Sequence, residues 1–168
     1  MGAIKPFYTL MEQHYEKYRV DRKPCKYGYS NQCAIRVSLA LSNCGFTYEE
    51  FVDQDRIHQG RPKCKLDDLP HIVGAEELKI FLEKVWGTWE FGKPLEMKEK
   101  IKGKRGIVYF NNCFRRKKSD TSLKGDHIDL WTGEKYYNQV LAIGAGGDAG
   151  TKTDLFSRAS YVSFFWLH

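Results

Sequence analysis

The sequence predicts an α+β domain in which N-terminal helices pack on one face of a C-terminal antiparallel sheet. In the first hundred residues, apolar side chains recur every three or four positions, as they do in helices. The second half instead carries short β-branched and aromatic runs separated by Gly, Ser, Thr and Asp. Because helices and strands do not alternate, a parallel βαβ arrangement is not expected. A length of 168 residues suits one core, so we expect a single domain over residues 1–168.

Four helices are predicted, over residues 33–43, 47–53, 75–86 and 94–102. Ser30 or Asn31 caps the first helix and Gly45 ends it. The second helix depends on a capping box formed by Thr47 and Glu50. The third has the clearest apolar stripe, and the fourth begins with a proline at its first helical position.

Four strands are predicted after the helices, over residues 106–110, 126–131, 136–143 and 161–167. Two segments between them are expected to be mobile. Residues 115–125 form a basic polar loop that begins with RRKK, and residues 144–153 contain many glycines.

Composition limits the classes of function. The net charge of +6 permits attraction to an anionic polymer or to an acidic protein partner. The five cysteines are scattered and odd in number, so neither a disulfide framework, a metal site nor an organic cofactor is expected. The sequence has no long apolar run and no signal-peptide pattern. We therefore expect synthesis in the cytoplasm without a signal peptide and no insertion into a membrane.

Cys33 is a candidate nucleophile because it falls in the first turn of the helix over residues 33–43. The unpaired N–H groups and the dipole of a first turn favour a thiolate and can also stabilise an oxyanion. Cys44, at the other end of the helix, lacks this environment. A buried packing role is the alternative interpretation of Cys33, since cysteine is often buried.

His127 is the candidate general base, because it is the one histidine within a predicted strand and imidazole titrates near neutrality. His127, Asp129 and Trp131 share a strand face that we expect to be the polar or functional one. If residues 133 and 134 form a two-residue hairpin turn, Asn138 pairs with Asp129 and lies diagonally from His127. Asn138 or Asp129 would then orient the imidazole, and the choice depends on the hairpin register. Structural roles for His127 and Asn138 are the alternatives.

Two segments, NQCAIRVSLAL at residues 31–41 and GDHIDLWTG at residues 125–133, resemble the signature blocks of the type VI secretion amidase effectors of the fourth family. The resemblance implies a papain-like, NlpC-type cysteine peptidase that cleaves the amide between D-glutamate and meso-diaminopimelate in peptidoglycan. Carried over by position, it makes Cys33 the nucleophile and His127 the base. The family has an acid at the position that holds Asn138 here, so the third role is open between Asn138 and Asp129.

The resemblance also implies partners and a location. Such effectors are secreted by the type VI machinery, act on peptidoglycan in the target cell's periplasm, and are neutralised by a cognate periplasmic immunity protein. In the mechanism, Tyr29 or Ser30 would help the Cys33 N–H to stabilise the oxyanion. Lys26, Arg36 or the RRKK run would bind substrate carboxylates. Two alternatives are a papain-like peptidase or acyltransferase with another substrate and a basic RNA- or protein-binding module, although no nucleic-acid-binding motif occurs.

Overall fold

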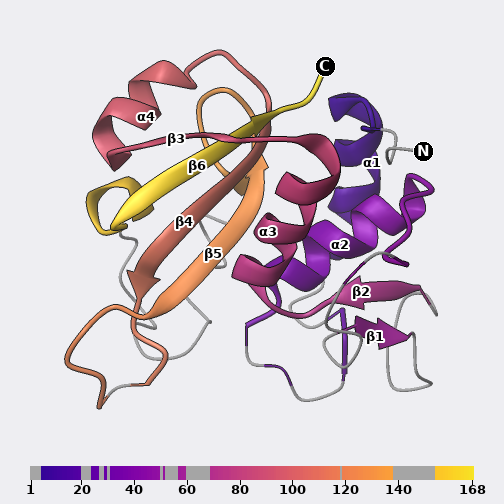
Figure 1. The fold of residues 1–168 in the computed structure, drawn as a ribbon, viewed down its shortest axis with the longest axis horizontal. Coiled ribbons are helices and arrows are strands. Elements are labelled where there is room, and N and C mark those ends of the chain that lie inside the picture. Colours follow the sequence, from indigo (N-terminus) through magenta and orange to yellow (C-terminus); the bar gives the residue numbers. More distant parts are fainter. Residues whose placement is uncertain are drawn as a thin grey trace. The chain divides into compact units, whose positions relative to one another are not determined.

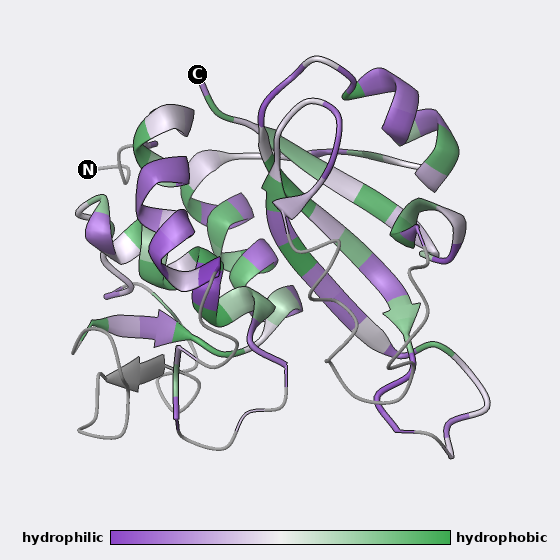
Figure 2. Ribbon diagram, turned by 180° about the vertical axis from the view of Figure 1, so that it is seen from behind, coloured by the Kyte–Doolittle hydropathy of each residue, from purple (hydrophilic) through white to green (hydrophobic). Residues whose placement is uncertain are grey.

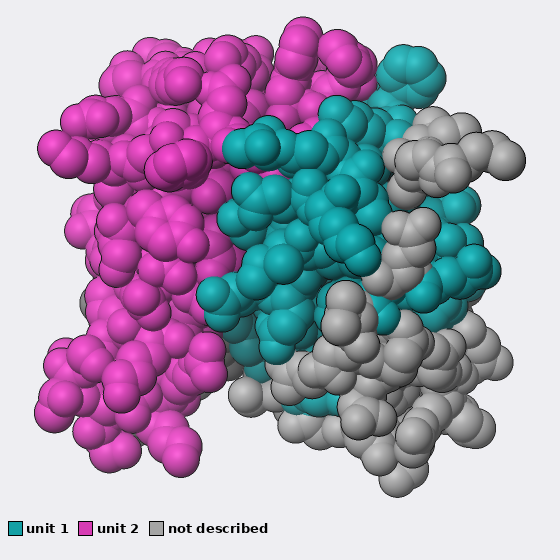
Figure 3. Space-filling model, in the orientation of Figure 1, with its two compact units in different colours: residues 1–88 teal, residues 89–168 magenta. Residues whose placement is uncertain are grey.

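The structure is a computed structural model that describes nine segments of the chain, and the side chains of residues 57–59 are not described. The segments are residues 5–19, 24–26, 29, 31–49, 51, 57–59, 69–117, 119–137 and 154–168. The chain divides into two compact units, residues 1–88 and residues 89–168, which Figure 3 distinguishes by colour. No described helix is both long and apolar enough to cross a membrane.

Unit 1 is built around three helices, α1 (Tyr8–Arg19), α2 (Cys33–Asn43) and α3 (Ala75–Trp86) (Figure 1). The ranges predicted for α2 and α3 are confirmed. Helix α1 was not predicted, although its buried residues recur at helical spacing. It packs on α2, and the buried Arg36 of α2 donates from Nε to the Tyr18 carbonyl of α1 at 3.0 Å.

A short antiparallel ladder completes unit 1, in the region between α2 and α3. Strand β1 (Ile57–Gln59) pairs with β2 (Pro70–Ile72). The hydroxyl of Ser38 on α2 receives the Ile72 N–H at 3.0 Å, which ties β2 to the helix. This ladder had no clear sequence pattern because its strands have only three residues each.

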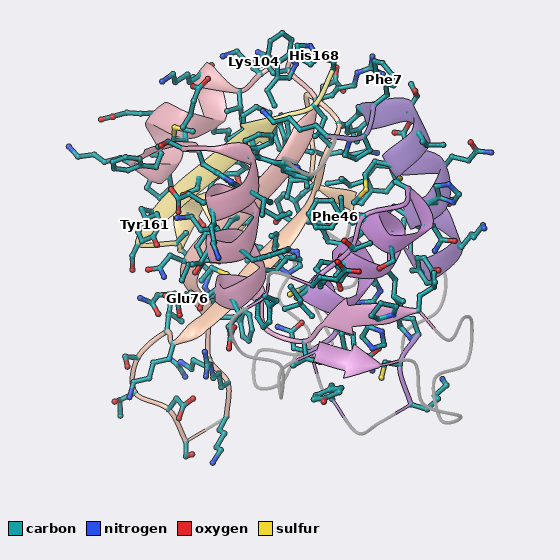
Figure 4. The ribbon with its side chains drawn as sticks, turned by 45° about the vertical axis from the view of Figure 1, so that its right-hand side comes forward. Phe7, Phe46, Glu76, Lys104, Tyr161 and His168 are labelled. Atoms are coloured by element: carbon teal, nitrogen blue, oxygen red, sulfur yellow. The ribbon has the colours of Figure 1, made fainter. Side chains whose placement is uncertain are left out.

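The helix predicted over residues 47–53 is wrong at the residues that are described, since Thr47 and Tyr48 have no regular secondary structure and Glu49 lies in a turn. Aromatic packing decides the local conformation here. Phe46 packs on Phe81 at 5.9 Å between ring centroids, and the Tyr48 hydroxyl donates to the Ser38 carbonyl at 2.6 Å. Phe46 is labelled in Figure 4. This burial outweighs the capping-box preference.

The described residues of unit 2 form a four-stranded antiparallel sheet, an α-helix and short 3-10 turns. In chain order its elements are β3 (Glu90–Gly92), α4 (Pro94–Lys100), β4 (Gly106–Phe114), β5 (Gly125–Trp131), η4 (Leu155–Ser157) and β6 (Tyr161–Trp166). The strand order is β3-β6-β4-β5, so β4 and β6 are central. The predicted α+β class is confirmed, and β3 is an additional strand.

One face of this sheet carries the core of unit 2. Residues of β4, β5 and β6 on this face pack with α4, η4 and Tyr136, and hydrophobic residues colour much of the sheet in Figure 2. The buried set is Met97, Ile101, Val108, Phe110, Cys113, Trp131, Tyr136, Leu155, Phe156, Val162 and Phe164. Helix α4 is two residues shorter than predicted, because the chain turns at Ile101 to Gly103.

A β-bulge interrupts the pairing of β4 with β5 between Phe110 and Phe114. Asn112 has a φ of 49°, in the left-handed region, and its N–H donates to Oδ1 of Asp126 at 2.8 Å. Asn111 donates to the same oxygen through Nδ2 at 3.3 Å. Strand β4 therefore continues four residues beyond its predicted end, with Asp126 holding the irregular step.

The predicted hairpin turn after β5 is confirmed at its first pair. Trp131 bridges Tyr136, and the Thr132 N–H donates to the Lys135 carbonyl at 2.9 Å. Gly133 supplies the positive φ, 101°, that the turn requires. The rest of the strand predicted over residues 136–143 is not confirmed at Tyr137, which is in a 3-10 conformation, and lies outside the described residues from position 138.

Candidate active site

Cys33 is the first residue of α2 and is 3% exposed. Its N–H donates to Oδ1 of Asn31 at 3.1 Å. The N-cap is Gln32, not Ser30 or Asn31 as predicted, and no side chain caps the helix from that position. The Asn31 side chain instead accepts from the first helical N–H, two residues along, in an Asx-turn pattern. Ser30 lies outside the described residues.

Gln32, directly before the cysteine, organises the preceding segment. It is buried, and its Oε1 accepts the Cys25 N–H at 2.9 Å while Nε2 donates to the Cys25 carbonyl at 2.5 Å. Nε2 also donates to the Tyr29 carbonyl at 3.1 Å. One amide thus joins both ends of the segment that leads into α2. Gln32 was not among the predicted site residues, although its position directly before Cys33 in the sequence could have indicated a role at the site.

The two cysteines at the ends of α2 have different surroundings. Cys44 follows the last helical residue, and burial raises the pKa of its thiol to about 11. Such a thiol is almost entirely protonated at neutral pH and is a poor nucleophile. This agrees with the expectation that the position at the start of the helix, not the one at its end, suits a nucleophilic cysteine.

His127 lies on β5 opposite Phe110 of β4, and its Nε2 is 3.3 Å from Oδ2 of Asp129. Both side chains are buried, at 4% and 0% exposure. The other Asp129 oxygen, Oδ1, accepts the Leu130 N–H at 2.8 Å. Asp129 therefore has a fixed orientation and can hold the imidazole ring in place. The structure brings these two predicted residues together.

The face of β5 that carries His127 is not the polar face that we expected. Phe110, at 6.2 Å between ring centroids, and Tyr136, at 6.1 Å, pack around the imidazole, and Phe156 lies 4.9 Å from Phe110. The correction has a physical reason: η4 and Tyr136, which are distant in sequence, close over this face. In such an apolar environment a hydrogen bond to a buried carboxylate is stronger than in water.

Tyr136 is held in this layer by its hydroxyl, which accepts the Leu155 N–H at 3.2 Å. Burial raises the pKa of the Tyr136 phenol to about 12, so the phenol is neutral near pH 7. The sequence offered no local signal that Tyr136 would pack on the histidine or that Phe156 would pack on Phe110 and Tyr136. In the described part of the chain, no three His, Cys, Asp or Glu side chains are grouped to bind a metal ion.

The other predicted site residues have different outcomes. Tyr29 is half-buried and turns its carbonyl toward Gln32. Asn138 lies outside the described residues. Arg36, considered as a ligand for substrate carboxylates, is buried against Tyr18, whereas Lys26 is exposed. Cys33 belongs to unit 1 and His127 to unit 2.

A papain-like, NlpC-type cysteine peptidase was predicted from a cysteine at the start of a helix and a histidine on a later strand, and the structure contains both elements. The α+β fold described above is consistent with that class. The chain belongs to the family of the type VI secretion system (T6SS) amidase effector protein 4, Tae4, whose family model matches residues 29–166.

Solved Tae4 structures share the fold over nearly the whole chain. Tae4 from Enterobacter cloacae is 17% identical, with a TM-score of 0.65 and 100% of both chains covered. The Tae4–Tai4 effector–immunity complex from Enterobacter cloacae gives 16% identity and a TM-score of 0.64, with 98% of this chain and 100% of that chain covered. The corresponding complex from Salmonella Typhimurium gives 15% and 0.63 at the same coverage. No curated protein sequence gives a significant match.

These comparisons confirm the predicted family and the prediction of an enzyme, an amidase effector of type VI secretion. They also decide between the two classes of protein considered from the sequence, an enzyme and a binding module. The family is one of amidases, so the alternative of a basic RNA- or protein-binding module is not retained.

Proposed function

We propose that the chain hydrolyses the amide between D-glutamate and meso-diaminopimelate in peptidoglycan stem peptides, with Cys33 as nucleophile and His127 as general base. The observation that carries the proposal is the buried His127–Asp129 pair, with Nε2 3.3 Å from Oδ2. A neutral imidazole that donates from Nε2 has its lone pair on Nδ1, which can accept a thiol proton. Family membership supplies the reaction class.

The reaction has two stages and uses only the chain's side chains and water. His127 takes the thiol proton, and Sγ of Cys33 attacks the γ-carbonyl carbon of the D-glutamyl residue. The tetrahedral intermediate collapses when the imidazolium protonates the diaminopimelate nitrogen, so the C–N bond breaks and a thioester remains. Water, deprotonated by His127, then attacks the thioester. The C–S bond then breaks, the D-glutamyl product leaves with a free γ-carboxylate, and the imidazolium returns its proton to the Cys33 thiolate.

Asp129 is proposed as the positioning residue for His127. Its carboxylate is buried, is held by the Leu130 N–H and lies within hydrogen-bond distance of the imidazole. Asn138 is the other candidate for this role, and the confirmed first pair of the hairpin supports the register on which that candidate depends. If Asp129 has this role, substitution of Asp129 should lower activity more than substitution of Asn138. If Asn138 has it, the order should be reversed.

The oxyanion would be stabilised at the start of α2. The Cys33 N–H donates to the Asn31 side chain, and we propose that the substrate oxygen replaces Oδ1 of Asn31 as its acceptor. A group from Tyr29 or Ser30 would provide the second hydrogen bond. The Gln32 amide supports this role, because it fixes the Tyr29 carbonyl and therefore the local direction of the backbone.

The two units are proposed to act as one amidase domain over residues 1–168. The family match from residue 29 to residue 166 spans both units. Cys33 lies in residues 1–88 and His127 in residues 89–168.

Secretion and neutralisation follow from the family. We propose that the chain passes from the cytoplasm of the producer through the type VI machinery and cleaves peptidoglycan in the periplasm of the target cell. Solved relatives are Tae4–Tai4 effector–immunity complexes. This supports a cognate immunity protein as the partner that protects the producer's periplasm.

The proposal is tested on purified peptidoglycan from a Gram-negative bacterium, with mass spectrometry of the released products. The wild-type chain should release fragments that end in D-glutamate and fragments that begin with diaminopimelate. Cys33→Ala should release none while keeping its circular dichroism spectrum, because the nucleophilic sulfur is missing. Release of products cut at another amide would contradict the proposed substrate bond, and activity of Cys33→Ala would contradict the nucleophile.

A further inference from the structure

The loop between β4 and β5, residues 115–124, is strongly basic, and we name it the basic hairpin. It holds five basic residues and one acidic residue, hence a charge of +4 within a chain whose net charge is +6. The basic residues are Arg115, Arg116, Lys117, Lys118 and Lys124. The hairpin extends from the end of the sheet (Figure 1).

Both the base and the tip of the basic hairpin have defined hydrogen bonds. At the base, the Lys124 N–H donates to the Phe114 carbonyl at 3.0 Å, and Gly125 lies so close to the Phe114 ring that an added Cβ would come within 2.3 Å of it. At the tip, the Lys117 N–H donates to Oδ2 of Asp120 at 2.9 Å, and the Asp120 N–H donates to the Lys117 carbonyl at 3.1 Å. The charges are therefore carried on a structured turn.

The cations of the basic hairpin are not neutralised by its surroundings. Arg115, Arg116, Lys117 and Lys124 are exposed. Within the described part of the chain, no carboxylate forms an ion pair with any of these four side chains. Glu90 and Asp154 pair instead with lysines of α4 and of the turn that follows it. A dense group of exposed cations without counter-charges attracts anionic ligands.

The basic hairpin is continuous with the strand that carries His127. Lys124 precedes His127 by three residues, a distance of about 10 Å along an extended strand. The bulge at Asn112 and the Asp126 carboxylate fix the connection between hairpin and strand. A ligand bound to the hairpin therefore lies next to the strand end at which the proposed base is located.

We propose that the basic hairpin binds carboxylates of the peptidoglycan stem peptides, which rests on the proposed function. A γ-linked D-glutamyl residue keeps a free α-carboxylate, and diaminopimelate also carries one, so the peptide near the cleaved bond is anionic. The planar guanidinium groups of Arg115 and Arg116 suit bidentate binding of such carboxylates. The hairpin would hold stem peptides of the insoluble polymer beside the catalytic strand.

The test is co-sedimentation with purified, uncleaved peptidoglycan, in the Cys33→Ala background so that the polymer stays intact. The charge-reversed double variant Arg115→Glu/Arg116→Glu is compared with the matched control Lys102→Glu/Lys135→Glu. Lys102 and Lys135 are exposed in turns at the other end of the β4–β5 pair, joined by a hydrogen bond from Gly103 N–H to the Gly133 carbonyl. Lys104, labelled in Figure 4, marks that end.

We expect the hairpin variant to bind about tenfold more weakly at about 50 mM salt and the control to change less than about twofold. The difference should disappear at about 500 mM salt, and also when the carboxylates of the polymer are converted to amides. Equal binding of the two variants would overturn the proposal, as would a difference that persists on amidated polymer. Weaker binding of the hairpin variant only to phosphatidylglycerol vesicles, or only to the immunity protein, would also overturn it.

This test is separate from that of the proposed function. A wild-type chain that binds peptidoglycan through the basic hairpin but releases no fragments would contradict the cleavage reaction alone. Cleavage with no dependence of binding on Arg115 and Arg116 would contradict the hairpin's role alone.

Discussion

The surroundings of Cys33 and of His127 are built in opposite ways. Cys33 is placed by polar contacts that are local in sequence, because Gln32 and Asn31 bond to backbone groups within seven residues of themselves. His127 is placed by an apolar layer assembled from distant segments, β4, Tyr136 and η4. The proposed nucleophile is therefore held by a hydrogen-bonded loop, whereas the proposed base is held by packing and a buried carboxylate.

The largest loss of kcat is expected for a substitution at the residue that orients His127. Asp129→Asn should reduce kcat by about a hundredfold to ten-thousandfold, because an amide does not stabilise the imidazolium and favours the wrong tautomer. Asn138→Ala should reduce kcat less than about threefold. The measurement is the rate of peptidoglycan fragment release, with thermal unfolding as a check that both variants fold. The reverse order of effects would give the positioning role to Asn138.

A smaller loss of kcat is expected for a substitution at Gln32, directly before Cys33. Gln32→Met removes three buried hydrogen bonds and should lower the free energy of unfolding by about 1–3 kcal/mol. It should also lower kcat about tenfold, because the segment before Cys33 loses its fixed path. The matched control is Asn43→Ala at the other end of α2, where Nδ2 donates to the Leu39 carbonyl and the Tyr18 hydroxyl. That variant should lose stability but keep kcat; an equal loss of kcat would make Gln32 a purely structural residue.

The smallest effect is expected at the C-terminal end of α2. Burial raises the Cys44 thiol pKa to about 11, so iodoacetamide should modify Cys44 slowly at pH 8 and faster only as the pH approaches 11. Because the pKa is raised in the folded chain, the stability that this group contributes is present below pH 9 and falls as the pH rises toward 11. Cys44→Ala should leave the rate of fragment release unchanged. Rapid modification at pH 8 would mean that the two ends of the helix are not distinct.

The difference between the surroundings of Cys33 and those of His127 also explains which features could be predicted from the sequence. The ranges of α2 and α3 followed from apolar spacing, and the turn at residues 133 and 134 followed from Gly133, all of which are local signals. The burial of the His127 face, the bulge at Asn112 and the non-helical conformation at Thr47 depend on side chains far away in the sequence. No local pattern indicates such contacts.

The same reasoning applies to the site residues. Cys33 and His127 were chosen because each sits at a recognisable point of a helix or a strand. The His127–Asp129 contact was left open, because it depends on side-chain direction as well as on strand register. Gln32 was missed because its role follows from bonds to Cys25 and Tyr29, which only the folded loop brings to it.

The most direct test of the central claim, that Cys33 of unit 1 and His127 of unit 2 act together, is the alkylation of Cys33 by iodoacetamide between pH 5 and pH 8. Peptide mass spectrometry would follow modification of Cys33 in the wild-type chain and in His127→Ala, with Cys44 as an internal reference in both. If His127 is the base, Cys33 should react at least about tenfold more slowly at pH 6 when the imidazole is removed, while the reactivity of Cys44 should not change. The same rate and pH profile for Cys33 in both chains would contradict it.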